Sequence, residues 1–184
     1  MPEQPEHADT RLAKGKQTRN RLLDEALRLF ALRGPEAVGT RELARAAGTN
    51  IASIAFHFGG KEGLYLAVAR HIVQTVNGWS KPIQAKIEKE LSQGNPGKEE
   101  SFLLLCELMD HIIEHALGSP ESKKWMGIFM REQIEPSDAF DILYEGVMEP
   151  FHRSLRSLVS AIMDLEVDAT ETKLRAYAAA GQVF

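Results

Sequence analysis

Residues 40–65, TRELARAAGTNIASIAFHFGGKEGLY, decide the fold of this chain. A short helix is predicted to begin at Thr40, whose hydroxyl can cap it. Its apolar stripe, at helical spacing, is Leu43, Ala44 and Ala47. Gly48 is predicted to end this helix in a left-handed conformation. Two residues later Asn50 can cap a second segment, 51–58, which a pair of glycines ends. Two short helices joined by a glycine-containing turn form the pattern of a helix-turn-helix.

The segments before and after this motif also predict helices. From Thr18 onward apolar residues recur at spacings that place them on one helix face, and Gly34 followed by a proline stops the pattern. These apolar residues are Leu22, Leu23, Ala26, Leu27 and Phe30. Residues 1–16 lack such periodicity, so we predict a flexible tail with a basic end. A longer helix is predicted from Lys61 to about Asn77.

The rest of the chain is predicted to be helical as well. Its helices are expected over 82–91, 101–117, 120–134, 136–162 and from 170 onward. The segment Asn95-Pro96-Gly97 is a break, and Pro150 is expected to kink the helix that contains it. No segment has the alternation of a strand, so we predict an all-α protein. Its predicted parts are a tail over 1–16, a helix-turn-helix domain over 17–64 and a second helical domain over 65–184.

Charge is distributed unevenly along the chain. The formal net charge is -4, but residues 11–70 hold eleven Lys or Arg against five Asp or Glu, whereas residues 71–184 hold eleven against eighteen. A basic segment joined to an acidic one indicates a nucleic-acid-binding part attached to a part with another role. No apolar run is long enough to span a bilayer, and the N-terminus lacks the pattern of a secretory signal. We therefore expect a cytoplasmic protein with no membrane partner.

The stretch 18–66 resembles the DNA-binding domain of the TetR family. LRLFALRG at 27–34 and the motif at 40–65 carry the resemblance, together with the Lys-Glu pair before Leu-Tyr. In the C-terminal half, MREQIEPSDAF at 130–140 and YEGVMEPF at 144–151 are similar to the C-terminal domain of the CecR-like subgroup. The resemblance implies a transcriptional regulator. We predict a repressor that binds a palindromic operator in double-stranded DNA as a homodimer and is released by a small lipophilic effector.

The resemblance places one face of the second short helix toward base edges in the major groove. The residues on this face are Asn50, Ile51, Ala52, Ser53, Ala55 and Phe56. Asn50 and Ser53 can exchange hydrogen bonds with bases, and the apolar residues can contact thymine methyl groups. Because the helix lacks Arg and Lys, part of the specificity is expected from DNA shape. Family members commonly have Tyr in place of Ala55 and a basic residue in place of Ile51, so those contacts are not carried over.

Phosphate contacts are expected to supply most of the affinity and to fix the register on DNA. One candidate is Thr40 with the backbone N–H groups at its helix start. The other candidates are Arg41, His57, Lys61, Lys14 and Lys16. Each basic residue can instead be an ordinary solvated side chain, and Phe56 and His57 can instead cover the core.

The resemblance also implies a dimer interface on the last two helices and a ligand pocket. The candidate dimer residues are Phe151, Leu155, Leu158, Val159 and Ile162. They can equally face the core of the single chain. Soft and aromatic side chains suit a pocket for a lipophilic compound, although plain core packing gives the same pattern. The candidate lining is Met109, Trp125, Phe129, Met130, Gln133, Phe140, Tyr144 and Met148.

One pair of residues has a spacing compatible with metal chemistry. His111 and His115 lie four residues apart on one predicted helix face, with Glu107, Asp110 and Glu114 nearby. A zinc hydrolase would have a glutamate directly after the first histidine, where this chain has Ile112. We therefore predict no metal site, no cofactor and no enzyme activity. An activator, a ligand-independent regulator and a metal-dependent helical enzyme remain the alternatives.

Overall fold

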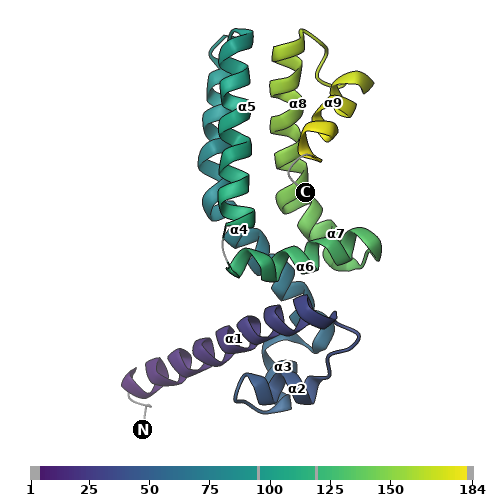
Figure 1. The fold of residues 1–184 in the computed structure, drawn as a ribbon. Helices are drawn as coiled ribbons and strands as arrows, with labels where there is room; N and C mark the ends of the chain where they lie inside the picture. The colour runs from purple at the N-terminus through teal and green to yellow at the C-terminus, as the bar shows by residue number, and fades with distance from the viewer. Residues whose placement is uncertain (1–4, 95, 119, 182–184) are drawn as a thin grey trace. The chain divides into compact units, whose positions relative to one another are not determined.

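The structure is a computed structural model that describes residues 5–94, 96–118 and 120–181 (Figure 1). Its helices are α1 (Pro5–Arg33), α2 (Thr40–Ala46), α3 (Ile51–Phe58), α4 (Lys61–Ser92), α5 (Lys98–Ile112), η1 (Ile113–Leu117), α6 (Pro120–Ile134), α7 (Asp138–Leu143), η2 (Tyr144–Met148), α8 (Glu149–Met163) and α9 (Thr170–Ala180). The two η elements are π-helices. The described residues contain no strand, which confirms the predicted all-α class. None of their helices is both long enough and apolar enough to cross a membrane.

The chain packs as two compact units. The first consists of Met1–Ile72 with Lys124–Phe140, and the second consists of Val73–Lys123 with Asp141–Phe184. Each unit is therefore built from two separate stretches of chain, and helices α4, α6 and α7 contribute residues to both. The boundary predicted between residues 64 and 65 stays a prediction.

The core of the first unit forms where α1, α2, α3 and the start of α4 meet. Its fully or almost fully buried apolar side chains are Leu22, Ala26, Phe30, Leu43, Ile54, Leu64 and Val68. The ring of Phe30 meets the ring of Tyr65 edge-on, with centroids 5.3 Å apart. Helices as short as α2 and α3 are marginal in isolation, so this shared core is what holds them in place.

Helix α6 packs closely against α1 within the first unit. A Cβ atom placed on Gly127 would lie 2.9 Å from the carbonyl oxygen of Ala31, so glycine lets the two backbones approach. Gly34, just after α1, has a φ of +79°, and a Cβ there would lie 2.7 Å from Cζ of Arg131. A side chain at either position would therefore disturb the contact between α6 and α1.

Within the first unit, a buried hydrogen-bond network also joins α6 to the start of α4. Tyr65 Oη donates to Glu132 Oε1 at 2.6 Å, and Glu132 is only 2% exposed. The same carboxylate accepts the backbone N–H of Ser137 at 2.9 Å and the hydroxyl of Ser137 at 2.9 Å. Burial raises the pKa of Tyr65, and the hydrogen bond to Glu132 raises it further. Three donors thus satisfy a carboxylate that would be costly to bury alone.

In the second unit, α8 contacts both α5 and α9. The buried side chains that these helices supply are Leu104, Leu108, Ile112, Leu155, Leu158, Val159, Ala176 and Ala180. In Figure 1, α5 (teal) and α8 (green) run alongside each other, and α9 (yellow) lies against α8. The π-helix η2 reaches α4 through Gly146, because a Cβ there would lie 2.6 Å from Cγ1 of Val73.

Three helix boundaries differ from the sequence predictions. Helix α1 already begins at Pro5, because proline suits a first helical turn and most of the residues after it are good helix formers. Helix α4 is continuous through Pro82, where two helices were predicted, and the buried Ile83 and Ile87 compensate for the lost hydrogen bond. The segment 136–162 contains the π-helix η2, which continues directly into α8, and Pro150 is the second residue of α8.

Candidate functional site

The turn between α2 and α3 fixes the orientation of α3. Gly48 has the predicted left-handed conformation with φ +61°, and Asn50 caps α3 by accepting the N–H of Ser53 at 2.9 Å. The Ser53 hydroxyl lies 3.0 Å from Asn50 Oδ1 and 2.8 Å from Thr49 Oγ1. Ile54 is 1% exposed and anchors the inner face. The predicted cap is confirmed, and it occupies the Asn50 oxygen that was also a candidate for base contacts.

The opposite face of α3 is open to solvent. Phe56 is 85% exposed and Ile51 is 46% exposed. Ala52 and Ala55 are exposed beside them, whereas His57 is half-buried with its ring centroid 4.9 Å from that of Phe56. A phenyl ring this exposed does not cover the core, so that alternative fails for Phe56. Large apolar side chains that share one exposed helix face mark a binding surface.

Helix α2 begins differently from the prediction. Its N-cap residue is Gly39, with an extended backbone and no side-chain cap, so the predicted capping role of Thr40 is wrong. Thr40 is the first residue of the helix, and the N-cap position is the residue that precedes the helix. Thr40 is half-buried, and Arg41 beside it is exposed.

Apart from Arg19, Lys61, Arg70, Lys124 and Arg131, the basic side chains that the structure describes in the first unit fall into two groups. Arg28 is held by Glu25 at 2.8 Å, and Arg33 is held by Glu42 at 2.6 Å. The second group is exposed and forms no ion pair within residues 5–94, 96–118 and 120–181: Lys14, Lys16, Arg21, Arg41 and Arg45. Cations without a protein partner are the ones that phosphate groups can pair with.

Two members of that second group were missed by the sequence reasoning. Arg45 lies one helical turn after Arg41 on α2, and this spacing of four residues was the signal that could have identified it. Arg21 comes from α1, and its Nη1 lies 3.7 Å from the position of a Cβ on Gly48. No local pattern connects Arg21 to the turn, because the fold brings the two together.

Lys61, which is half-buried, and Arg19, which is exposed, each contact another part of the first unit. Lys61 Nζ donates to the carbonyl oxygen of Pro35 at 3.0 Å and so ties the start of α4 to the loop before α2. A phosphate contact by Lys61 would compete with this bond. The guanidinium of Arg19 lies over the ring of Phe58, 5.2 Å from its centroid.

The residues predicted to line a ligand pocket lie in both units. Trp125 and Phe129 are buried on α6, with ring centroids 5.8 Å apart. Met130 is 48% exposed and lies on another face of the same helix, whereas Gln133 follows Phe129 by one turn but is exposed near the end of α6. The remaining candidates are half-buried: Met109, Phe140, Tyr144 and Met148. The pocket stays a prediction.

The candidate dimer residues divide by burial. Leu155 and Leu158 are fully buried within the chain itself, and Val159 is 6% exposed. For these three residues the alternative of core packing applies, because α5 and α9 cover α8. Phe151 and Ile162 are half-buried. The large apolar side chains that α8 and α9 leave exposed are Met163, Leu174 and Tyr177.

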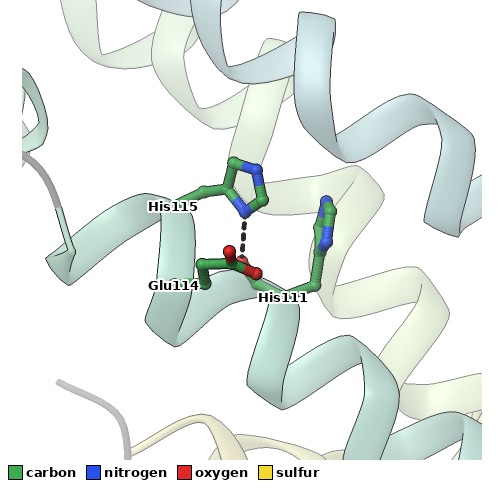
Figure 2. A group of neighbouring side chains, drawn as sticks. All are labelled: His111, Glu114 and His115. Carbon is green, nitrogen blue, oxygen red and sulfur yellow. Dashed lines mark hydrogen bonds between the residues drawn. The ribbon is translucent and has the colours of Figure 1, made fainter.

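The structure brings the two spaced histidines together with one carboxylate (Figure 2). One ligand atom from each of His111, Glu114 and His115 lies within 4.8 Å of the others. Glu107, on the same helix, instead pairs with Lys86 at 2.6 Å. Such a set of side chains could hold a metal ion, but it does not supply the glutamate that a zinc hydrolase uses as a base.

Comparison with known proteins places this geometry in a family. Residues 22–68 match the family of bacterial regulatory proteins of the tetR type, and residues 100–184 match the C-terminal domain of the helix-turn-helix transcriptional dual regulator CecR. CecR from Shigella flexneri is 31% identical over 170 residues, which span 92% of this chain and 75% of that relative.

Two solved structures share the fold. HlyIIR, a hemolysin II transcriptional regulator, has a TM-score of 0.64 at 20% identity, with 92% of this chain and 86% of that chain covered. AibR, solved in complex with isovaleryl coenzyme A and operator DNA, has a TM-score of 0.64 at 18% identity, with 90% and 83% covered. These matches and the identity to CecR confirm the resemblance on which the site residues were chosen. The chain therefore belongs to the TetR family of bacterial transcriptional regulators, as a CecR-like member.

Proposed function

We propose that this regulator is a repressor that binds a palindromic operator as a homodimer and leaves it when a small lipophilic ligand binds. The observation that carries the proposal is the outer face of α3. This exposed face runs from Ile51 to Phe56, with Ala52 and Ala55 between them, and Ile54 is buried, on a helix fixed at both ends by the Asn50 cap and by Gly59 in the left-handed conformation. A rigid apolar face of this size fits the thymine-methyl surface of a major groove.

The charges around the motif support DNA as the partner. Arg41 and Arg45 on α2 and Arg21 beside the turn are exposed and unpaired among the described residues, so they are free to neutralise phosphates. Operator affinity should then fall steeply with salt, because each phosphate contact releases a counterion. Base recognition comes from apolar contacts and DNA shape, since α3 carries neither Arg nor Lys.

A dimer is proposed because one short recognition helix buries too little DNA for tight binding, and a two-fold dimer can read both halves of a palindrome. The side chains best placed for the subunit contact are Leu174, 64% exposed, and Tyr177, 48% exposed, on α9. Leu174→Glu should therefore produce monomers in analytical ultracentrifugation. A dimer that survives this change would contradict an α9 interface.

The proposed effector rests on the aromatic side chains of α6. The aromatic pair Trp125 and Phe129 offers apolar, polarisable surface of the kind that binds lipophilic compounds. AibR binds both an acyl coenzyme A and operator DNA, so the shared fold accommodates both kinds of partner in that protein. An effector would act by favouring a conformation of the dimer that does not fit the operator.

The decisive experiment measures fluorescence anisotropy of labelled DNA from the region upstream of the gene. Ala55→Glu places a carboxylate on the exposed face of α3, where it would repel the DNA, and should weaken binding at least about a hundred-fold. Ala85→Glu is the matched control, because Ala85 is exposed on α4 in the second unit. Equal binding by both variants and the wild type would refute the proposed interface.

Promoter reporters would separate repression from activation. The relative CecR is described as a dual regulator, so reporters should be examined for changes in both directions. Deletion of the gene should raise expression from a promoter that the protein represses. A consistent fall in expression would instead support the activator alternative.

A further inference from the structure

Three side chains with metal-ligating atoms meet at the junction of α5 and η1, away from the surfaces used so far. His111 lies in the last turn of α5, and Glu114 and His115 lie on η1. Their ligand atoms lie within 4.8 Å of one another, and the two imidazole centroids are 4.2 Å apart. Figure 2 shows the two rings and the carboxylate on the same side of the helix.

Backbone carbonyls fix the tautomer of both imidazoles. His111 Nε2 lies 2.8 Å from the carbonyl oxygen of Trp79, and His115 Nδ1 lies 2.9 Å from the carbonyl oxygen of His111. A carbonyl oxygen only accepts, so each of these nitrogens carries the hydrogen. In a neutral ring the lone pair then lies on the other nitrogen, which is Nδ1 of His111 and Nε2 of His115. Metal-binding histidines commonly donate their second ring N–H to a carbonyl oxygen in this way. Figure 2 shows Nδ1 of His115, and not Nε2, on the side of Glu114, so the His115 ring has to turn over before its lone pair faces the carboxylate.

The indole of Trp79 holds the histidine rings in place. It stacks on His115 with ring centroids 5.1 Å apart and an interplanar angle of 21°, and its centroid is 5.7 Å from that of His111. Trp79 lies in the turn before Pro82, whose missing N–H leaves the carbonyl of the neighbouring Gly78 without its helical donor. These contacts therefore keep the two imidazoles close to each other before any ligand arrives.

Two further observations favour a ligand over simple packing. The helix widens into the π-helix η1 at this point, and π-bulges occur frequently at functional sites. Glu114 is exposed and forms no ion pair among the described residues, whereas Glu107 on the preceding turn is paired with Lys86. Stacking on Trp79 accounts for the position of the histidines alone, and it does not account for the carboxylate beside them.

We propose that His111, Glu114 and His115 bind one divalent transition-metal ion of the zinc class. Two imidazoles and one carboxylate are the donor set that Zn²⁺, Ni²⁺ and Co²⁺ accept, whereas Mg²⁺ and Ca²⁺ prefer oxygen ligands throughout. Bonds of about 2.0–2.2 Å place tetrahedral donors about 3.4 Å apart, so the ligand atoms must close in by a little over about 1 Å. Rotation of the exposed Glu114 side chain and of the His115 ring would bring the donors together, and the fourth position would remain open to water or to a further ligand.

Calorimetry with ZnCl₂ on the full chain, freed of metal by a chelator, tests the proposal without DNA. The wild type should bind one ion per chain. His115→Phe keeps a ring stacked on Trp79 and removes both nitrogens, so its Zn²⁺ affinity should fall by at least about a hundred-fold. Glu114→Gln should lower the affinity at least about ten-fold. Glu100→Gln, an exposed acid on α5, is the matched control and should bind Zn²⁺ as the wild type does.

Fluorescence locates the ion. Trp79 and Trp125 are the two tryptophans, so Trp125→Phe leaves Trp79 as the only reporter. Ni²⁺ should quench its emission, and an excess of Zn²⁺ should prevent the quenching because both ions use the same ligands. Circular dichroism of each variant verifies that it is folded. The proposal is overturned if the wild type takes up no Zn²⁺, if His115→Phe binds it equally well, or if Glu114→Gln retains full affinity.

Discussion

Helices α3 and α8 both carry large apolar side chains but use them in opposite ways. On α3, Ile51 and Phe56 stand in solvent, and only Ile54 is buried. On α8, Leu155 and Leu158 are buried by the chain's own α5 and α9. Apolar content alone therefore does not reveal what a helix contacts. The buried face of α8 is covered from within the chain, whereas no part of the described chain covers Ile51 and Phe56 on α3.

The two helices can be told apart by removing side chains from each. Leu155→Ala should lower the free energy of unfolding by about 3 kcal/mol, because it leaves a cavity in a fully buried site. Chemical denaturation followed by circular dichroism measures the change. Leu103→Ala on α5 is the control, since Leu103 is 62% exposed and its loss should cost less than about 0.5 kcal/mol. An equal loss of unfolding free energy in the two variants would contradict the claim that the buried Leu155 stabilises the fold more than the exposed Leu103 does.

On α3, Phe56→Ala should leave stability nearly unchanged and weaken DNA binding. Its side chain is 85% exposed, so the free energy of unfolding should change by less than about 0.5 kcal/mol. Operator affinity should nevertheless fall about ten-fold, through lost contact with base edges. Phe102→Ala, which removes a phenyl ring that is 54% exposed on α5, should leave DNA binding unchanged. Anisotropy titrations at one fixed salt concentration compare the two variants.

The cap of α3 offers a smaller effect. Asn50→Ala removes the acceptor for the Ser53 N–H and should lower the free energy of unfolding by about 1 kcal/mol. Asn50→Ser should retain most of that stability, because serine also caps helices well. Urea denaturation of both variants measures these changes in the free energy of unfolding. A fully stable alanine variant would mean that packing, and not the cap, holds α3.

His152 gives α8 a mild dependence on pH. Burial lowers its pKa below the ordinary value of 6.5, Glu149 opposes this shift, and Arg156 adds to it. Nδ1 of His152 is buried without a hydrogen-bond partner among the described residues. The unfolded chain therefore binds a proton more readily, and the folded state loses stability as the pH falls through 6.5 toward the lower folded-state pKa.

Melting temperatures at about pH 7.5 and about pH 5.5 test this effect. The wild type should lose more stability on acidification than His152→Phe, which cannot take up the proton. A pH dependence that is the same in both proteins would assign it to other groups.

The sequence predicted the helix-turn-helix because its signals are local. Gly48, Asn50 and Gly59 act within a few residues of themselves, and the structure confirms their roles in the turn and in both ends of α3. The all-α class was also predictable, since helical periodicity persists along most of the chain. Thr40 was assigned to the cap one residue too late, which is an ordinary error at a helix start.

What could not be predicted depends on contacts between distant residues. Tyr65 and Glu132 are 67 residues apart, and nothing near either one signals their hydrogen bond. Leu155 and Leu158 have the periodicity of an interface or of a core, and only the positions of α5 and α9 decide between them. Arg21 reaches the turn at Gly48 only in the folded chain.

The hydrogen bond between Tyr65 and Glu132 limits how this protein can be combined with its relatives in a chimera. A chimera that joins residues 1–72 to a foreign C-terminal half would leave the Tyr65 hydroxyl without its hydrogen-bond acceptor. That acceptor, Glu132, belongs to the stretch 124–140 of the same compact unit. The unit that would have to be transferred therefore consists of two separate stretches of the sequence. A graft that retains the DNA-reading specificity of this chain needs to carry 124–140 with it, including the glycine at 127 that admits the neighbouring backbone.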